Sequence, residues 1–208
     1  MRIYPTVQEL MARIERGPGA TDVDVEAVRS ASPGQLPEDY LAFLRWANGA
    51  EGYVAGRGYV RLWSAQDVVR FNRAYQIPDF IPGALLVGTD ASVMGYGFDW
   101  TAGDPRIVDV ELAALDREYV RNVAGSFTEL IRRLASEPLP AGASELADHG
   151  PPEWLRDKVV HEKHPVVLGG SADDPDNRGL IPADQHPALC IFFARTLREV
   201  RRKSRSDC

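Results

Sequence analysis

Histidines and aspartates in the last quarter of the chain are the residues whose types could bind a metal ion. They are His161, His164, His186, Asp173, Asp174 and Asp176. Imidazole and carboxylate groups are common ligands of zinc. The spacing argues against such a site, because Pro165 follows His164 directly and disfavours a helix that presents two imidazoles on one face. No HExxH-type base accompanies them, so the sequence predicts neither a metal site nor a cofactor.

The segment DPDNRG, which starts at Asp174, has the composition of the beginning of a calcium-binding loop. Such a loop needs an oxygen ligand at its fifth position and a bidentate glutamate at its twelfth. Those positions hold Arg178 and Gln185. Aspartate side chains also accept hydrogen bonds from backbone amides two residues later and so stabilise turns. We therefore interpret this segment as a turn-forming loop.

Patterns for nucleophilic catalysis or phosphate binding are equally weak. Neither a GxSxG elbow nor a CxxC pair occurs, and Ser64 and Ser126 have the positions of helix caps. The glycines of GYVAGRGY lack the lysine of a phosphate-binding loop, and VMGYG lies within a strand pattern instead of opening a helix. The sequence predicts no catalytic residues and a protein that is not an enzyme.

The charge of the chain is unevenly distributed. The formal net charge is −6, yet residues 195–208 carry six bases and two acids, a local +4, which leaves −10 on the remainder. The negative charge of this remainder disfavours nucleic acid as a partner. It favours a basic protein, because complementary electrostatic fields accelerate the encounter of two proteins. Solubility alone is the other explanation of this charge. The basic end has the composition of a solvated helix terminus.

The location that we predict is the cytoplasm. No apolar run is long enough to span a membrane, and the start, MRIYPTVQELMARIERG, is amphipathic with acids, unlike a secretory signal. Only Cys190 and Cys208 are present, so a structural disulfide is not expected. We expect a soluble protein without membrane contacts, as a monomer or a weak homodimer.

Helix and strand signals have clear boundaries and predict an α+β fold. Capping patterns begin helices at Thr6, Thr21, Ser64 and Ser126, and we expect the first of these to continue to Gly17-Pro18. A further helix has Pro37 in its first position and ends at Asn48-Gly49. Alternating segments, which predict an antiparallel meander, are GYVRLW, ALLVGTD, MGYGFDW and RIVDVEL.

The chain divides by composition into three parts. Residues 1–135 hold these elements and form one domain, and residues 136–152 are rich in Pro, Ala and Gly, as in a linker or a strap. Residues 153–208 are too few for a comfortable core of their own. We expect this C-terminal helical extension, with its terminal helix, to pack on the main domain.

An ordered series of segments carries a resemblance to a known family. It comprises LPEDYLAFLRWANG (36–49), YVRLWSAQDVVRFN (59–72), IPGALLVGTDASVMGYGFDW (81–100), IVDVEL (107–112) and VAGSFTELIRRL (123–134). This series resembles the SUKH superfamily, which groups the yeast Smi/Knr regulators of cell-wall synthesis with many bacterial proteins. The resemblance implies a single domain in which helices pack on a central antiparallel sheet.

The same resemblance implies a protein-binding module without catalytic residues. Bacterial SUKH proteins are known chiefly as immunity proteins that neutralise secreted polymorphic toxins, often nucleases or deaminases. The compact chain favours this branch, and we expect a cognate, basic toxin as the partner. A regulatory or scaffold adaptor like the yeast members is the alternative, and a small-ligand sensor or metal-dependent enzyme ranks third.

For the partner contacts, we select aromatic and acidic residues around the meander. Tryptophan and tyrosine are favoured interface anchors, and acids would complement a basic toxin. The selected residues are Trp63, Tyr96, Asp99, Trp100, Asp104, Asp109 and Glu111. Trp63 also fits the core side of its strand, and Asp104 also fits the turn in which it lies. We expect Trp100, at a strand end, to be the most informative aromatic residue to test.

Overall fold

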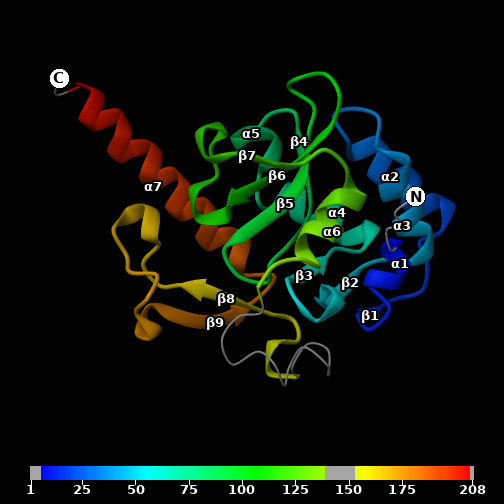
Figure 1. The fold of residues 1–208 in the computed structure, drawn as a ribbon. Coiled ribbons are helices and arrows are strands. Elements are labelled where there is room, and N and C mark those ends of the chain that lie inside the picture. Colours follow the sequence, from blue (N-terminus) through cyan, green and yellow to red (C-terminus); the bar gives the residue numbers. More distant parts are fainter. Residues whose placement is uncertain (1–5, 139–152, 207–208) are drawn as a thin grey trace.

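The computed structural model describes residues 6–138 and 153–206 (Figure 1). Within them the chain forms a seven-stranded antiparallel sheet in the order β1 to β7 and a separate two-stranded sheet, β8–β9. The strands are β1 Glu15–Arg16, β2 Ala50–Tyr53, β3 Tyr59–Leu62, β4 Ala84–Thr89, β5 Met94–Asp99, β6 Arg106–Glu111, β7 Arg121–Ala124, β8 Lys158–Glu162 and β9 Arg178–Pro182. The helices are α1 Val7–Leu10, α2 Asp22–Ala31, α3 Glu38–Trp46, α4 Ala65–Ala74, α5 Ile77–Phe80, α6 Phe127–Leu134 and α7 His186–Ser206. The α+β prediction with helices on a central antiparallel sheet is confirmed.

The helix caps agree with the sequence prediction. Thr6 and Thr21 form capping boxes, and the hydroxyls of Ser64 and Ser126 accept hydrogen bonds from the backbone N–H three residues later. These bonds satisfy amides that have no partner inside the helix. Gly49, after α3, has φ +90°, where a side chain would be strained. The predicted boundaries of these helices therefore follow from local chemistry.

The predicted length of the first helix is wrong. The helix α1 ends at Leu10 instead of continuing to Gly17-Pro18. Glu15 and Arg16 form the strand β1, which pairs with Glu51 and Ala50 of β2. Strand pairing with a distant segment overrides the helical pattern of the sequence here, because tertiary contacts outweigh weak local propensity.

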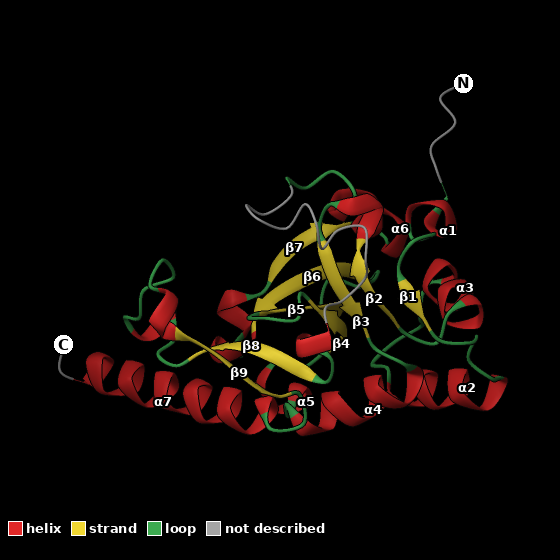
Figure 2. Ribbon diagram, turned by 90° about the horizontal axis from the view of Figure 1, so that it is seen from below, coloured by secondary structure: helices red, strands yellow, loops and turns green. Residues whose placement is uncertain are grey.

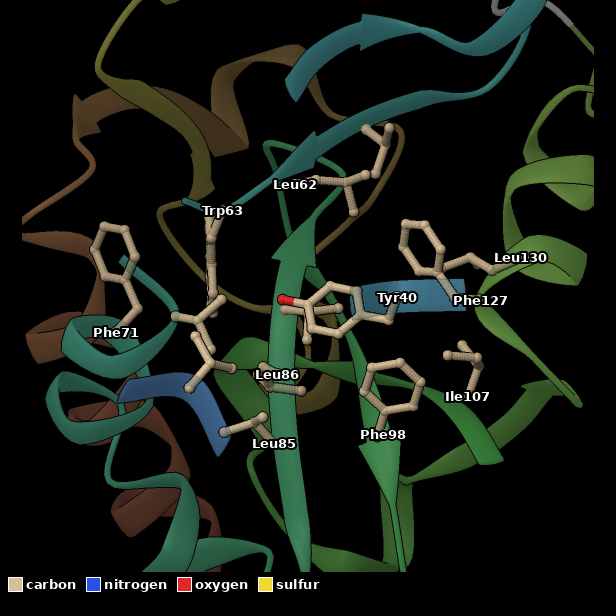
Figure 3. Packing of buried hydrophobic residues seen from close by; sticks show 14 of the residues in the cluster. Tyr40, Leu62, Trp63, Phe71, Leu85, Leu86, Phe98, Ile107, Phe127 and Leu130 are labelled. Atoms are coloured by element: carbon tan, nitrogen blue, oxygen red, sulfur yellow. The ribbon is translucent and has the colours of Figure 1, made fainter. Parts of the chain in front are cut away.

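The main hydrophobic core lies between α3, α6 and one face of the sheet. Tyr40 from α3 packs edge-on against Phe98 of β5 and Phe127 of α6, with ring centroids 5.2 and 5.4 Å apart (Figure 3). Phe43 lies 5.0 Å from Phe127. These positions are buried. The aromatic helix of residues 38–46 thus serves the core.

The C-terminal extension packs on the main domain at its other side. Figure 2 shows α7 running past α5 and α4, away from α3 and α6. Cys190 and Ala194 of α7 belong to the same buried cluster as the core of the main domain. Arg198 extends to the Phe80 carbonyl oxygen, and the backbone N–H of Val160 donates to Ala91. The helix α7 therefore contacts the main domain through both buried side chains and hydrogen bonds.

The proposed division of the chain remains a prediction. Most of the linker or strap expected at 136–152 lies outside the described residues, and the boundaries at 135 and 153 are not tested. Among the helices of the described residues, none has the length and apolar character needed to cross a membrane.

Candidate functional site

The structure places Trp63 in the interior. Only 5% of its surface is exposed, and its ring packs against Phe71 at 4.9 Å and parallel to Tyr75 at 6.2 Å. The expectation that Trp63 is an exposed anchor is therefore wrong. The residue follows β3, and the second half of α4 with its C-cap Tyr75 packs against its ring.

Tyr96, Asp109 and Glu111 lie together on neighbouring strands. Tyr96 is opposite Asp109 in the β5–β6 register. Asp109 is buried and receives two hydrogen bonds from Arg121 of β7, at 2.8 and 2.9 Å. Burial raises the pKa values of Tyr96 and Glu111. The carboxylate of Asp109 is thus already paired within the chain.

Asp99, Trp100 and Asp104 lie at the opposite end of the β5–β6 hairpin. Asp99 accepts hydrogen bonds from Thr101 and from Arg117, the latter at 2.6 Å. Trp100 is half-buried, and its indole N–H donates to the Gln35 carbonyl oxygen at 3.2 Å. Asp104 is exposed in the turn. The structure therefore separates the selected residues into three places.

A groove of about 380 Å³ lies between the main domain and the extension. Strands β1 to β3 and the start of α4 form its domain side, and the extension contributes the other wall. Trp63 and Phe71 provide aromatic surface. The charged lining residues are Glu15, Arg16, Glu51, Arg61, Asp67, Arg70, Arg156 and Asp157. Sequence reasoning missed this groove because five segments that are distant in the sequence build it, and Trp63 is the one selected residue among its lining residues.

The ion pairs of the groove differ in how firmly they are held. Arg61 bonds Glu51 at 2.5 Å and donates to the carbonyl oxygens of Lys158 and Leu155, and its side chain is only 12% exposed. The pairs Arg70–Asp67 and Arg156–Glu15, at 2.8 and 3.5 Å, are much more exposed. Exposed pairs contribute about 0–1 kcal/mol. Arg61 therefore joins the extension to the sheet, and the other pairs can exchange partners at low cost.

The histidines do not gather with the aspartates of the loop. His161 and His186 are buried and face each other with ring centroids 5.2 Å apart, whereas His164 is exposed. Asp174 accepts a hydrogen bond from the N–H of Asp176, which confirms the turn-forming interpretation. Within residues 6–138 and 153–206, no three metal-ligating side chains are placed to hold an ion.

A comparison with protein families shows to which family the chain belongs. The SMI1 / KNR4 family (SUKH-1) matches residues 19–133, more than half of the chain. The chain belongs to the SMI1 / KNR4 family. The predicted resemblance to the SUKH superfamily is confirmed, and the matched region contains α2 to α6 but none of the extension. A search of curated proteins finds no match.

Proposed function

We propose that this SMI1 / KNR4 family protein is a non-enzymatic immunity protein of the cytoplasm that binds and neutralises a cognate secreted toxin. The groove beside Trp63 is the observation that carries the proposal. It offers a concave, partly aromatic surface with charged walls, which suits a protruding side chain of a protein. The family supports a protein-binding role.

The charges of the groove fit a basic segment of the toxin. Glu15 is held by an exposed ion pair, and Asp67 by an exposed ion pair and a hydrogen bond from the Ser64 hydroxyl, so an incoming arginine can replace Arg70 or Arg156 at little cost. Asp157 adds a third carboxylate. Trp63 and Phe71 also line the groove, but only 5% and 8% of their surfaces are exposed, so the charged side chains provide the main contacts of this proposal.

The net negative charge of the chain outside residues 195–208 also favours a basic partner. Outside residues 195–208 the formal charge is −10, and such a field accelerates the approach of a basic partner. The proposed mechanism is steric and electrostatic blockade of a toxin domain, such as a nuclease or a deaminase, without turnover.

The first experiment identifies the partner. Tagged protein captures binding proteins from the lysate and secreted fraction of the source cells, mass spectrometry identifies them, and co-expression tests rescue from toxicity. A captured toxin whose effect is suppressed supports the proposal. Capture of a cell-wall or signalling complex without rescue supports the adaptor instead.

The second experiment locates the contact on the groove. The double variant Asp67→Asn/Asp157→Asn removes two charges, and asparagine tolerates the positive φ of Asp157. We expect toxin affinity to fall about tenfold or more, since lost charge pairs in an interface cost at least 1.4 kcal/mol. The control, Asp22→Asn/Glu26→Gln on α2, makes the same charge change away from the groove. Equal affinities of the two variants would exclude the groove as the contact.

Asp99, Trp100 and Asp104 remain a proposed second contact. Trp100 is half-buried and lies at the other end of the hairpin. Trp100→Ala in the same binding assay tests it. Unchanged affinity removes these residues from the interface, while a loss with retained cooperative unfolding includes them.

A further inference from the structure

Four side chains form a buried polar cluster where the extension meets the main domain. The Tyr75 hydroxyl of α4 lies 2.6 Å from Nδ1 of His186, at the start of α7. The Cys190 sulfur lies 3.4 Å from Nε2 of the same ring. The ring of His161, from β8, meets His186 edge-on at 5.2 Å. The exposed fractions of His161 and His186 are 6% and 1%.

The surroundings of the two imidazoles favour their neutral forms. Within the described residues, neither ring has a carboxylate as a hydrogen-bond partner, and His161 also stacks on Phe193 of α7. The nearest charged groups lie outside the cluster. Glu162 acts to raise the pKa of His161, and Glu111 of β6 acts to raise the pKa of Cys190. Arg61 of β3 acts to lower the pKa of Tyr75. Glu162 alone favours a charged imidazole at His161.

Protonation is therefore coupled to whether the extension is docked. Burial lowers the pKa of His186 to about 3, with a further contribution from His161, and burial also lowers the pKa of His161. In an undocked extension both imidazoles meet water and regain a pKa near 6.5. The undocked state thus binds more protons, so acid favours it. Below about pH 6.5, each pH unit shifts the equilibrium toward undocking by up to about tenfold for each histidine.

We propose that His161 and His186 form a pH-sensitive latch that docks the extension at neutral pH and releases β8, β9 and α7 upon acidification. Both histidines belong to the extension, and Tyr75 provides the main-domain side of the latch. The sheet and its aromatic core contain neither residue and stay folded. Release also removes Arg156, Asp157 and Ala183 from the groove wall. The latch concerns the protein alone and does not depend on the identity of the toxin.

The test is an NMR titration of the full chain from pH 7.5 to 4. Backbone amide signals report β8, β9 and α7 separately from β4 to β6, and the imidazole Hε1 signals report each histidine. We expect the extension signals to change together at a midpoint between about pH 4 and 6, before the sheet signals change.

Variants separate the latch from general acid unfolding. His186→Gln keeps a polar group beside Tyr75 without a titrating ring, and His161→Phe keeps the stacking on Phe193. Either change should lower the midpoint of extension release by about one pH unit, and the exposed-site control His164→Gln should leave it unchanged. If one variant fails to fold, the other decides. Simultaneous loss of sheet and extension signals, or a midpoint that neither variant moves, would overturn the latch.

Discussion

The aromatic core and the contact between the extension (residues 153–208) and the main domain, here called the seam, are stabilised by different kinds of interaction. The core joins α3 and α6 to the sheet through Tyr40, Phe98 and Phe127, all almost fully buried. The seam combines the buried Cys190 and Ala194 of α7 with polar contacts, such as those of Arg61 with two carbonyl oxygens and of Tyr75 with His186. The burial of an apolar side chain involves no proton, whereas the burial of a titrating imidazole such as that of His186 depends on pH. We therefore expect a main domain whose stability changes little with pH and an extension whose docking depends on pH.

The largest effect should come from the core. Phe127→Ala removes a ring that packs against Tyr40 and Phe43. Such a cavity should lower the free energy of unfolding by about 3–5 kcal/mol. Urea unfolding followed by circular dichroism measures it. A loss under about 1 kcal/mol would show that α6 can collapse onto the sheet, and the contrast with the seam would disappear.

An intermediate effect is expected at the seam. Arg61→Met keeps an apolar stem but removes the donors to Lys158, Leu155 and Glu51. We expect a loss of about 1–3 kcal/mol, because two carbonyl oxygens and the Glu51 carboxylate lose a charged donor. Hydrogen exchange should show this loss in β8 and α7 more than in β5. The control Arg70→Met breaks an exposed ion pair and a guanidinium contact with the Phe71 ring and should change stability by less than about 1 kcal/mol. Equal losses in β5 and α7 would mean that seam and core unfold as one unit.

The core was predictable from the sequence because its signals are local. Caps at Ser64 and Ser126 and the apolar spacing of residues 38–46 fix where helices lie and which sides they bury. The strand β1 was not predictable, since Glu15 and Arg16 become a strand only by pairing with β2. Two residues carry no periodicity of their own.

The groove and the histidine cluster lay beyond sequence reasoning for a related reason. Trp63 and Arg156 are far apart in the chain, and only the docking of the extension brings them to one cavity. The histidines suggested metal ligands by their residue type alone, because their burial is not visible in the sequence. His161 meets His186 instead of His164, since alternation on β8 turns His161 inward and the chain leaves the strand before His164.

The smallest effect is expected at the outer half of α7, where basic residues contact the main domain. Arg201 bonds Glu118 at 2.5 Å and contacts the ring of Tyr119. Because Glu118 is exposed, Arg201→Met should cost less than about 1 kcal/mol, and the cost should shrink from 0.05 to 0.5 M salt. Thermal unfolding at both salt concentrations measures this difference. A cost above that of Arg61→Met would place the main attachment of the extension on the charged face of α7, and acid release through the histidines would then leave the outer helix bound.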